Sequence, residues 1–129
     1  MTIRVVIVDD HTLVRRSLRM LLSQSSDIQV VGEADNGEDA IDLISNLQPD
    51  LVLLDVSMPR MNGISVTRRL MEMKIPALVL ILSMFADASL AREALRLGAR
   101  GYLLKTHISS ELLPAIRQIK AGTPFLVQS

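Results

Sequence analysis

Polar side chains that suit a cation and a phosphate follow the apolar runs of this 129-residue sequence. Asp9 and Asp10 follow one run, and Asp55, Ser83 and Lys105 each follow another. Carboxylates that share one cleft repel each other by roughly 4 kcal/mol per pair at about 4 Å and an effective dielectric near 20. A hard divalent cation with oxygen ligands would offset that repulsion, and Mg²⁺ is the common choice where phosphate also binds. The sequence therefore predicts an acidic cation site.

Helix capping is the ordinary alternative explanation for such residues, because Asp and Ser favour N-cap positions. Capping does not explain two adjacent carboxylates after one apolar run, a third after another, and a lysine at the end of a further run. We therefore expect these side chains to form one site.

The segments that carry these residues alternate between two hydrophobic patterns. Runs of branched aliphatic residues at 3–8, 28–32, 51–54, 77–82 and 101–104 predict five strands, and most of these runs lack polar alternation, as is typical of strands covered on both faces. Between and after them, apolar residues at helical spacing predict five helices, near 13–22, 40–47, 64–73, 90–97 and 112–119. Asn36 is placed to cap the second helix.

Strict alternation of strand and helix predicts an α/β fold, a doubly wound parallel sheet with right-handed crossovers. For five strands and five helices the expected strand order is 2-1-3-4-5, the flavodoxin-like arrangement. Ligands bind such sheets beyond the carboxyl ends of the strands, where strands 1 and 3 meet. Asp9, Asp10 and Asp55 are predicted to lie there.

Composition excludes several classes of function. The 14 basic and 14 acidic residues give no net charge that would attract nucleic acid. With no cysteine, the chain has no disulfide, zinc ribbon or thiol nucleophile, and a cytoplasmic location is expected. Its apolar runs are too short for a membrane span or a signal peptide. We expect a single domain.

Four segments in this order, VDDH at 8–11, LDVSMPRMNG at 54–63, LSM at 82–84 and GYLLK at 101–105, give the chain a family resemblance. The sequence resembles, over nearly its whole length, the receiver domains of two-component response regulators, in particular those of the NarL/FixJ subfamily. This resemblance implies a CheY-like fold and a phosphorylation-dependent signalling switch rather than an enzyme. It also implies transcription regulation through a LuxR-type DNA-binding domain that is absent from this chain, with a receiver at 1–121 and the start of a linker at 122–129.

The resemblance also implies a role for each residue of the acidic site. Asp55 would accept a phosphoryl group from a sensor histidine kinase, or from a small donor such as acetyl phosphate. The Mg²⁺ ligands would be Asp9, Asp10, Asp55 and the backbone carbonyl of Ser57. Lys105 and Ser83 would hold phosphoryl oxygens. Movement of Ser83 toward the phosphoryl group would open space for the ring of Tyr102, the aromatic switch residue.

Some residues depart from the common family pattern. Thr106 follows the lysine where many receivers have proline, so we expect a trans bond before it. Met84 and Phe85 follow the switch hydroxyl, and we expect them to screen the acyl phosphate from water and slow its hydrolysis.

Other polar residues are expected to have no part in the site. We interpret His11 and His107 as loop or solvated residues, because neither has a second histidine at ligand spacing. Arg15, Arg16 and Arg19 are expected to form a solvated helix face, and a homodimer through the first and fifth helices on phosphorylation is compatible with the sequence.

Three other functions compete with the receiver as interpretations of this sequence. A phosphatase of the haloacid-dehalogenase kind would need Asp-x-Asp after the first strand, where this chain has adjacent aspartates. A flavin-binding module would need a phosphate loop rich in Ser, Thr and Gly at the same place. A degenerate receiver that acts as an unphosphorylated interaction module remains the main alternative.

Overall fold

The computed structural model describes residues 2–126 of the chain. Its parallel sheet has the order β2-β1-β3-β4-β5-β6. The strands are β1 Ile3–Val8, β2 Ile28–Ala34, β3 Leu51–Asp55, β4 Leu78–Ser83, β5 Gly101–Leu104 and β6 Phe125–Leu126. The predicted order of the first five strands is confirmed.

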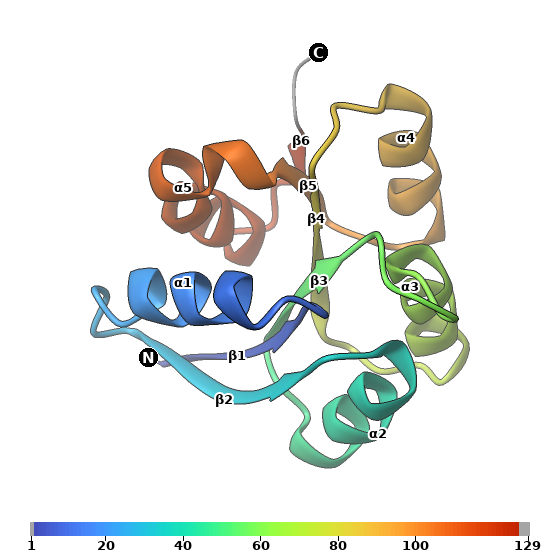
Figure 1. The fold of residues 1–129 in the computed structure, drawn as a ribbon, viewed down its shortest axis with the longest axis horizontal. Helices are drawn as coiled ribbons and strands as arrows, with labels where there is room; N and C mark the ends of the chain where they lie inside the picture. The colour runs from blue at the N-terminus through green and yellow to red at the C-terminus, as the bar shows by residue number, and fades with distance from the viewer. Residues whose placement is uncertain (1, 127–129) are drawn as a thin grey trace.

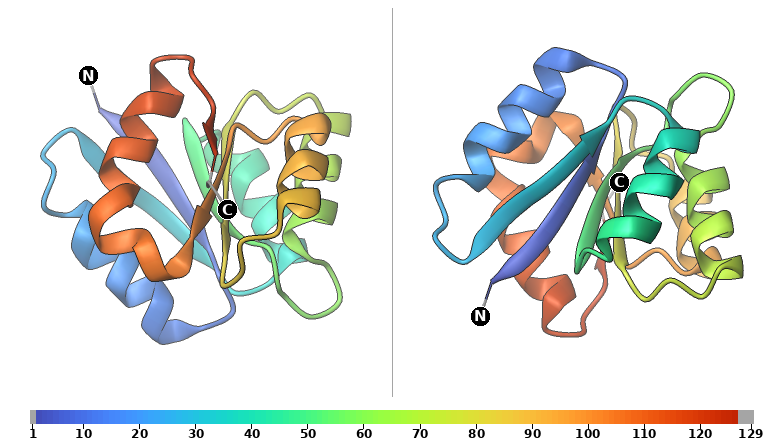
Figure 2. Two further views of the ribbon diagram at one scale, coloured as in Figure 1. Left: turned by 90° about the horizontal axis from the view of Figure 1, so that it is seen from above. Right: turned by 90° about the horizontal axis from the view of Figure 1, so that it is seen from below.

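Helices cover both faces of this sheet (Figure 1). They are α1 Thr12–Leu22, α2 Gly37–Leu47, α3 Gly63–Glu72, α4 Ala88–Leu97 and α5 Ile108–Lys120, with a short 3-10 turn at Lys105–His107. Figure 2 shows α1 and α5 on one side of the sheet and α2, α3 and α4 on the other. This is the two-sided cover that a doubly wound sheet requires, and the α/β prediction is confirmed.

The central strands are apolar without alternation because both of their faces are buried. Leu51 and Leu53 of β3 pack into the core on the α1 and α5 side, whereas Val52 and Leu54 pack into the core on the α2, α3 and α4 side. Every residue of β3 is buried, including Asp55 at its end. A carboxylate is therefore carried on the most enclosed strand of the molecule, at the point where that strand reaches the edge of the sheet.

The expectation of five strands was one strand short. Phe125 and Leu126 pair in parallel with Gly101 and Tyr102 of β5, and the Phe125 N–H donates to the carbonyl of Arg100 at 3.0 Å. Two residues are too few to give a hydrophobic period, so the sequence pattern places them in the predicted linker segment 122–129. Residues 127–129 of that predicted segment lie outside the described residues.

Local capping fixes where several helices begin, and therefore how the loops above the sheet are shaped. Asn36 accepts a hydrogen bond from the Asp39 N–H, which confirms the predicted cap, and Asn62 caps α3 in the same way.

None of the helices in residues 2–126 is long and apolar enough to cross a membrane.

Candidate functional site

The sheet brings the predicted acidic residues together at its carboxyl edge. Val8 of β1 pairs with Leu54 of β3, so the residues that follow them, Asp9 and Asp55, lie on adjacent strands. One carboxylate oxygen from each of Asp9, Asp10 and Asp55 lies, together with a ring nitrogen of His11, in a cluster whose members are within 4.8 Å of one another. Pairing of β1 with β3 brings Asp55 close to Asp9 and Asp10, which lie far from it along the chain.

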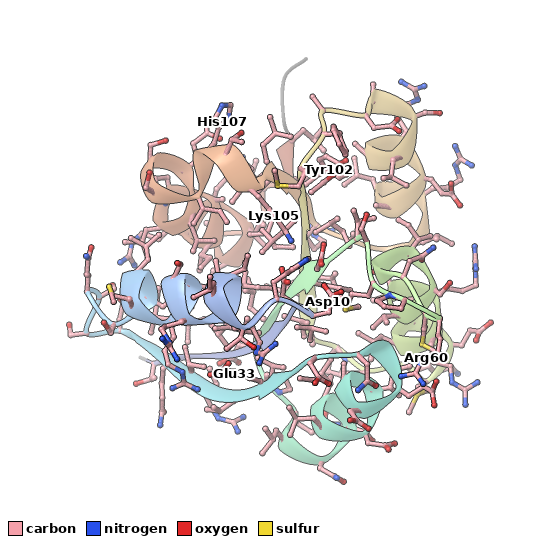
Figure 3. All side chains as sticks on the ribbon, viewed as in Figure 1. Asp10, Glu33, Arg60, Tyr102, Lys105 and His107 are labelled. Carbon is pink, nitrogen blue, oxygen red and sulfur yellow. The ribbon has the colours of Figure 1, made fainter. Side chains whose placement is uncertain are left out.

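Lys105 reaches this cluster from the end of β5. Its Nζ lies 2.7 Å from Asp9 Oδ2 and 3.2 Å from Asp55 Oδ1, and its side chain is only 9% exposed. Figure 3 shows Lys105 and Asp10 near the same end of the sheet. Burial alone would lower the pKa of Lys105, but its contacts with Asp9 and Asp55 outweigh burial and raise that pKa. The lysine is therefore held as a cation.

Asp55 lies in a more enclosed environment than an ordinary surface carboxylate. Its side chain is 3% exposed, its Oδ1 accepts a hydrogen bond from the Ser57 N–H at 3.1 Å, and its Oδ2 has no hydrogen-bond partner. Burial, and then the charge of Asp9, raise the pKa of Asp55 above its ordinary value. The structure thus presents a carboxylate with one oxygen held and one oxygen free.

The pocket fits a hard divalent cation. Asp55 Oδ2 and Asp10 Oδ1 are both buried and accept no hydrogen bond, an arrangement that is costly unless another group satisfies these oxygens. Carboxylate oxygens are the ligands that Mg²⁺ prefers. The Ser57 N–H is fixed on Asp55, whereas the ligand role of the Ser57 carbonyl stays a prediction.

Ser83 and Tyr102 meet at one backbone carbonyl. Ser83, at the end of β4, donates to the Phe85 carbonyl at 3.1 Å and accepts from the Phe85 N–H at 3.1 Å. The Tyr102 hydroxyl donates to the same carbonyl at 2.8 Å, and its ring is fully buried in the core beneath α4. The ring therefore lies in the interior while Ser83 is bonded to Phe85, and the coupling of Ser83 movement to Tyr102 stays a prediction.

The residues expected to control access lie at the surface. Met84 is 57% exposed and Phe85 is 76% exposed. Met84 and Lys105 line a groove of about 430 Å³ together with Leu13, Val14, Ser17, Thr106, Ile108 and Ser109. Met84 is thus at the rim beside Lys105, and its effect on water stays a prediction. The bond between Lys105 and Thr106 is trans, as predicted.

Arg15 and His11, two residues near the site, make contacts that the sequence does not predict. Arg15 Nη1 donates to the Asp9 carbonyl at 2.7 Å, and its Nε donates to Glu33 Oε1 at 3.1 Å, so the expectation that Arg15 is solvated was wrong. His11 Nδ1 lies 3.1 Å from both Asp9 Oδ1 and Asp10 Oδ1. Neither contact could be predicted from the sequence. Glu33, a partner of Arg15, lies on β2, and the orientation of His11 depends on the loop between β1 and α1.

Comparison with known proteins agrees with the geometry of the site. The response regulator receiver domain family matches residues 5–117. The chain is 39% identical to the nitrate/nitrite response regulator NarL of Escherichia coli K12, over 97% of this chain and 58% of that protein. It is 35% identical to the transcriptional regulatory protein DegU of Brevibacillus brevis, over 96% of this chain and 52% of that protein. The chain thus spans little more than half the length of these relatives.

Solved structures give the same result. The signal receiver domain of a NarL response regulator from Mycobacterium tuberculosis superposes with a TM-score of 0.89 at 38% identity, covering 94% of this chain and 98% of that one. A LuxR-family two-component response regulator from Aurantimonas superposes with a TM-score of 0.92 at 34% identity, covering 97% and 89%. With this fold, these relatives and the acidic pocket at the expected edge, the chain belongs to the response regulator receiver domain family, and its relatives are regulators of the NarL and DegU type.

Proposed function

We propose that this receiver is switched by phosphorylation of Asp55. One observation carries the proposal: the Asp55 carboxylate is buried at the end of β3, with Oδ1 beside Lys105 and Oδ2 free of any hydrogen bond. A free carboxylate oxygen in an enclosed acidic pocket is a nucleophile that needs no general base, because it is already ionised above its pKa.

The transfer forms one bond and breaks another. A carboxylate oxygen of Asp55 attacks the phosphorus of a phosphohistidine on a sensor kinase, and the P–N bond breaks as the O–P bond forms. The electron pair of the broken bond stays on the imidazole nitrogen, and the product is an acyl phosphate. With acetyl phosphate as donor, the P–O bond to the acetyl group breaks instead and acetate leaves.

The pocket residues would hold Mg²⁺ in this reaction. Asp10, Asp55 and the Ser57 carbonyl are the proposed direct ligands, and Asp9 is proposed to act through water. When bound, the ion supplies positive charge against the charge that develops on the phosphoryl oxygens. Asp9 has a second task, because it holds the Lys105 ammonium at 2.7 Å and keeps it beside Asp55.

Lys105 and Ser83 are proposed to receive the new phosphoryl oxygens. Phosphorylation adds charge and three acceptor oxygens at Asp55. To donate to one of them, the Ser83 hydroxyl must leave the Phe85 carbonyl, which Tyr102 also uses. The signal would thus pass from Asp55 to the β4–α4 loop and alter the surface formed by α4, β5 and α5.

The wider role is proposed from the relatives. NarL is named a nitrate/nitrite response regulator and DegU a transcriptional regulatory protein, and each is longer than this chain. We propose a receiver at 1–121 and a linker beginning at 122 that leads to a DNA-binding domain in the full-length protein. A sensor histidine kinase would be its partner in the cytoplasm, and homodimerisation on phosphorylation would carry the output.

Acetyl phosphate labelling tests the central step. The chain is incubated with acetyl phosphate and Mg²⁺, and its intact mass is measured. Wild type is expected to gain one phosphoryl group, Asp55→Ala is expected to gain none, and Asp42→Ala, a change at an exposed residue of α2, is expected to label like wild type. Label on Asp55→Ala would refute the acceptor assignment. An unlabelled wild type would favour the unphosphorylated interaction module.

A further inference from the structure

The imidazole of His11 stands at the mouth of the acidic pocket and faces two of its carboxylates. Its Nδ1 lies 3.1 Å from Asp9 Oδ1 and 3.1 Å from Asp10 Oδ1, and its side chain is 63% exposed. A hydrogen bond joins His11 to Asp9, whereas Asp10 Oδ1 accepts none despite the same distance. The imidazole nitrogen therefore faces an Asp10 oxygen that has no hydrogen-bond partner.

We propose that His11 is a metal-ligand residue that extends this pocket to transition-metal cations of the Zn²⁺ class. The inference rests on the proposed function, because it uses the same carboxylates that are assigned to Mg²⁺. It adds a nitrogen ligand to them. The unpartnered Oδ2 of the buried Asp55 is the independent sign that the pocket is built to take a cation.

The spacing of the donor atoms supports this assignment. Two neighbouring ligands on one ion, each at about 2.0 to 2.1 Å from it, lie about 3 Å apart when they subtend a right angle, and somewhat farther apart in a tetrahedral site. The 3.1 Å separation between His11 Nδ1 and Asp10 Oδ1 matches that value without any movement. Lys105 approaches Asp9 at its other oxygen, Oδ2, so it does not stand between His11 and the carboxylates.

The type of donor decides which ion gains from His11. Imidazole nitrogen suits Zn²⁺ and other transition metals, whereas Mg²⁺ takes oxygen ligands almost exclusively. His11 should therefore strengthen Zn²⁺ binding and leave Mg²⁺ binding nearly unchanged. Both ions would compete for Asp10 and Asp55, so His11 would set how strongly the pocket discriminates between them.

Calorimetric titration of Zn²⁺ and of Mg²⁺ into separate samples of the whole chain tests the proposal. The variants are His11→Gln, which keeps a hydrogen-bonding side chain but removes the imidazole, and His107→Gln as the matched control. His107 is the second of two histidines, is 49% exposed and lies 3.7 Å from Glu111. We expect His11→Gln to lower Zn²⁺ affinity by about tenfold or more and to change Mg²⁺ affinity by less than about twofold. The control should change neither.

The imidazole nitrogens provide a second readout. Long-range ¹H–¹⁵N spectra report the state of each ring nitrogen, and the two histidines are assigned from the variants. The Nδ1 resonance of His11 should shift on addition of Zn²⁺ and stay in place on addition of Mg²⁺. A residue that only positions Asp9 through a hydrogen bond would not show this difference.

Several results would overturn the inference. Zn²⁺ affinity that survives His11→Gln would reduce His11 to a hydrogen-bond donor. Equal losses for both ions would mean that the ring only positions the carboxylates, and loss of Zn²⁺ binding in His107→Gln would place the ion elsewhere. In each of these cases Mg²⁺ binding by wild type, and with it the proposed function, still stands. Failure of wild type to bind Mg²⁺ would instead count against both.

Discussion

Removal of the Asp55 charge should stabilise the chain when no divalent cation is present. The variant is Asp55→Asn, which keeps the shape of the side chain and abolishes its charge. Asp55 is buried, and it shares its pocket with Asp9 and Asp10. We propose that Asp55 is retained for phosphoryl transfer and not for stability. Because its negative charge is held beside two other carboxylates, that charge is expected to lower the free energy of unfolding.

The size of the effect follows from two distances. One carboxylate oxygen from each of Asp9, Asp10 and Asp55 lies within 4.8 Å of the other two. At that distance and an effective dielectric of about 20, each pair that includes Asp55 repels by roughly 3.5 kcal/mol, or about 7 kcal/mol for two pairs. Attraction between Lys105 Nζ and Asp55 Oδ1, which lie 3.2 Å apart, offsets about 5 kcal/mol of this repulsion. The free energy of unfolding should therefore rise by about 2 kcal/mol in Asp55→Asn.

Thermal unfolding in EDTA, followed by circular dichroism, measures this difference. For a chain of this size, a gain of about 2 kcal/mol corresponds to a Tm increase of about 6 to 10 °C. Addition of Mg²⁺ should raise the Tm of wild type more than that of the variant and narrow the gap. The control is Asp42→Asn, which removes a charge from an exposed position of α2 and should change stability by less than about 0.5 kcal/mol.

The pH dependence of the gap has a definite sign. Burial and the charge of Asp9 raise the pKa of Asp55 in the folded chain. Wild type is therefore penalised when Asp55 is ionised, so the gap is full above the raised pKa. As pH falls through that pKa, Asp55 takes up a proton and the gap should close. A variant that is no more stable than wild type in EDTA at neutral pH would refute the reasoning.

Three further outcomes are expected from other contacts. Tyr102→Phe removes the hydrogen bond to the Phe85 carbonyl, so it should lower the free energy of unfolding, measured by urea denaturation, by about 1 kcal/mol. Labelling of this variant by acetyl phosphate should persist, and loss of labelling would contradict the prediction. Asp27→Asn should lower Tm slightly at neutral pH, because Arg117 holds the pKa of Asp27 far below its ordinary value. This Tm difference between wild type and variant should persist into acidic solution and disappear only as Asp27 itself becomes protonated. Thermal melts measured across pH would contradict the reasoning if the difference disappeared at a higher pH. Met84→Ala should shorten the lifetime of the acyl phosphate several-fold, as measured by loss of the phosphoryl mass with time, and an unchanged lifetime would mean that Met84 does not screen the site.

Much of the fold could be predicted because the hydrophobic effect acts on local pattern. Strands buried on both faces need continuous apolar residues, as in Leu51–Asp55, and helices that cover a sheet need one apolar stripe. The edge where Asp55 meets Asp9 followed from strand order alone. The short strand Phe125–Leu126 could not be predicted, because two residues gain their place only from the exposed edge of β5.

The sequence by itself determined the acidic cluster and its lysine, because parallel strands must end at one edge and carry their last residues there. Only the tertiary structure decided how the side chains around that cluster point. Arg15 donates to the Asp9 carbonyl instead of pointing into solvent, and the ring of Tyr102 is buried under α4. His11 faces the carboxylates of Asp9 and Asp10. These orientations depend on packing between elements far apart in the chain, which no local pattern encodes.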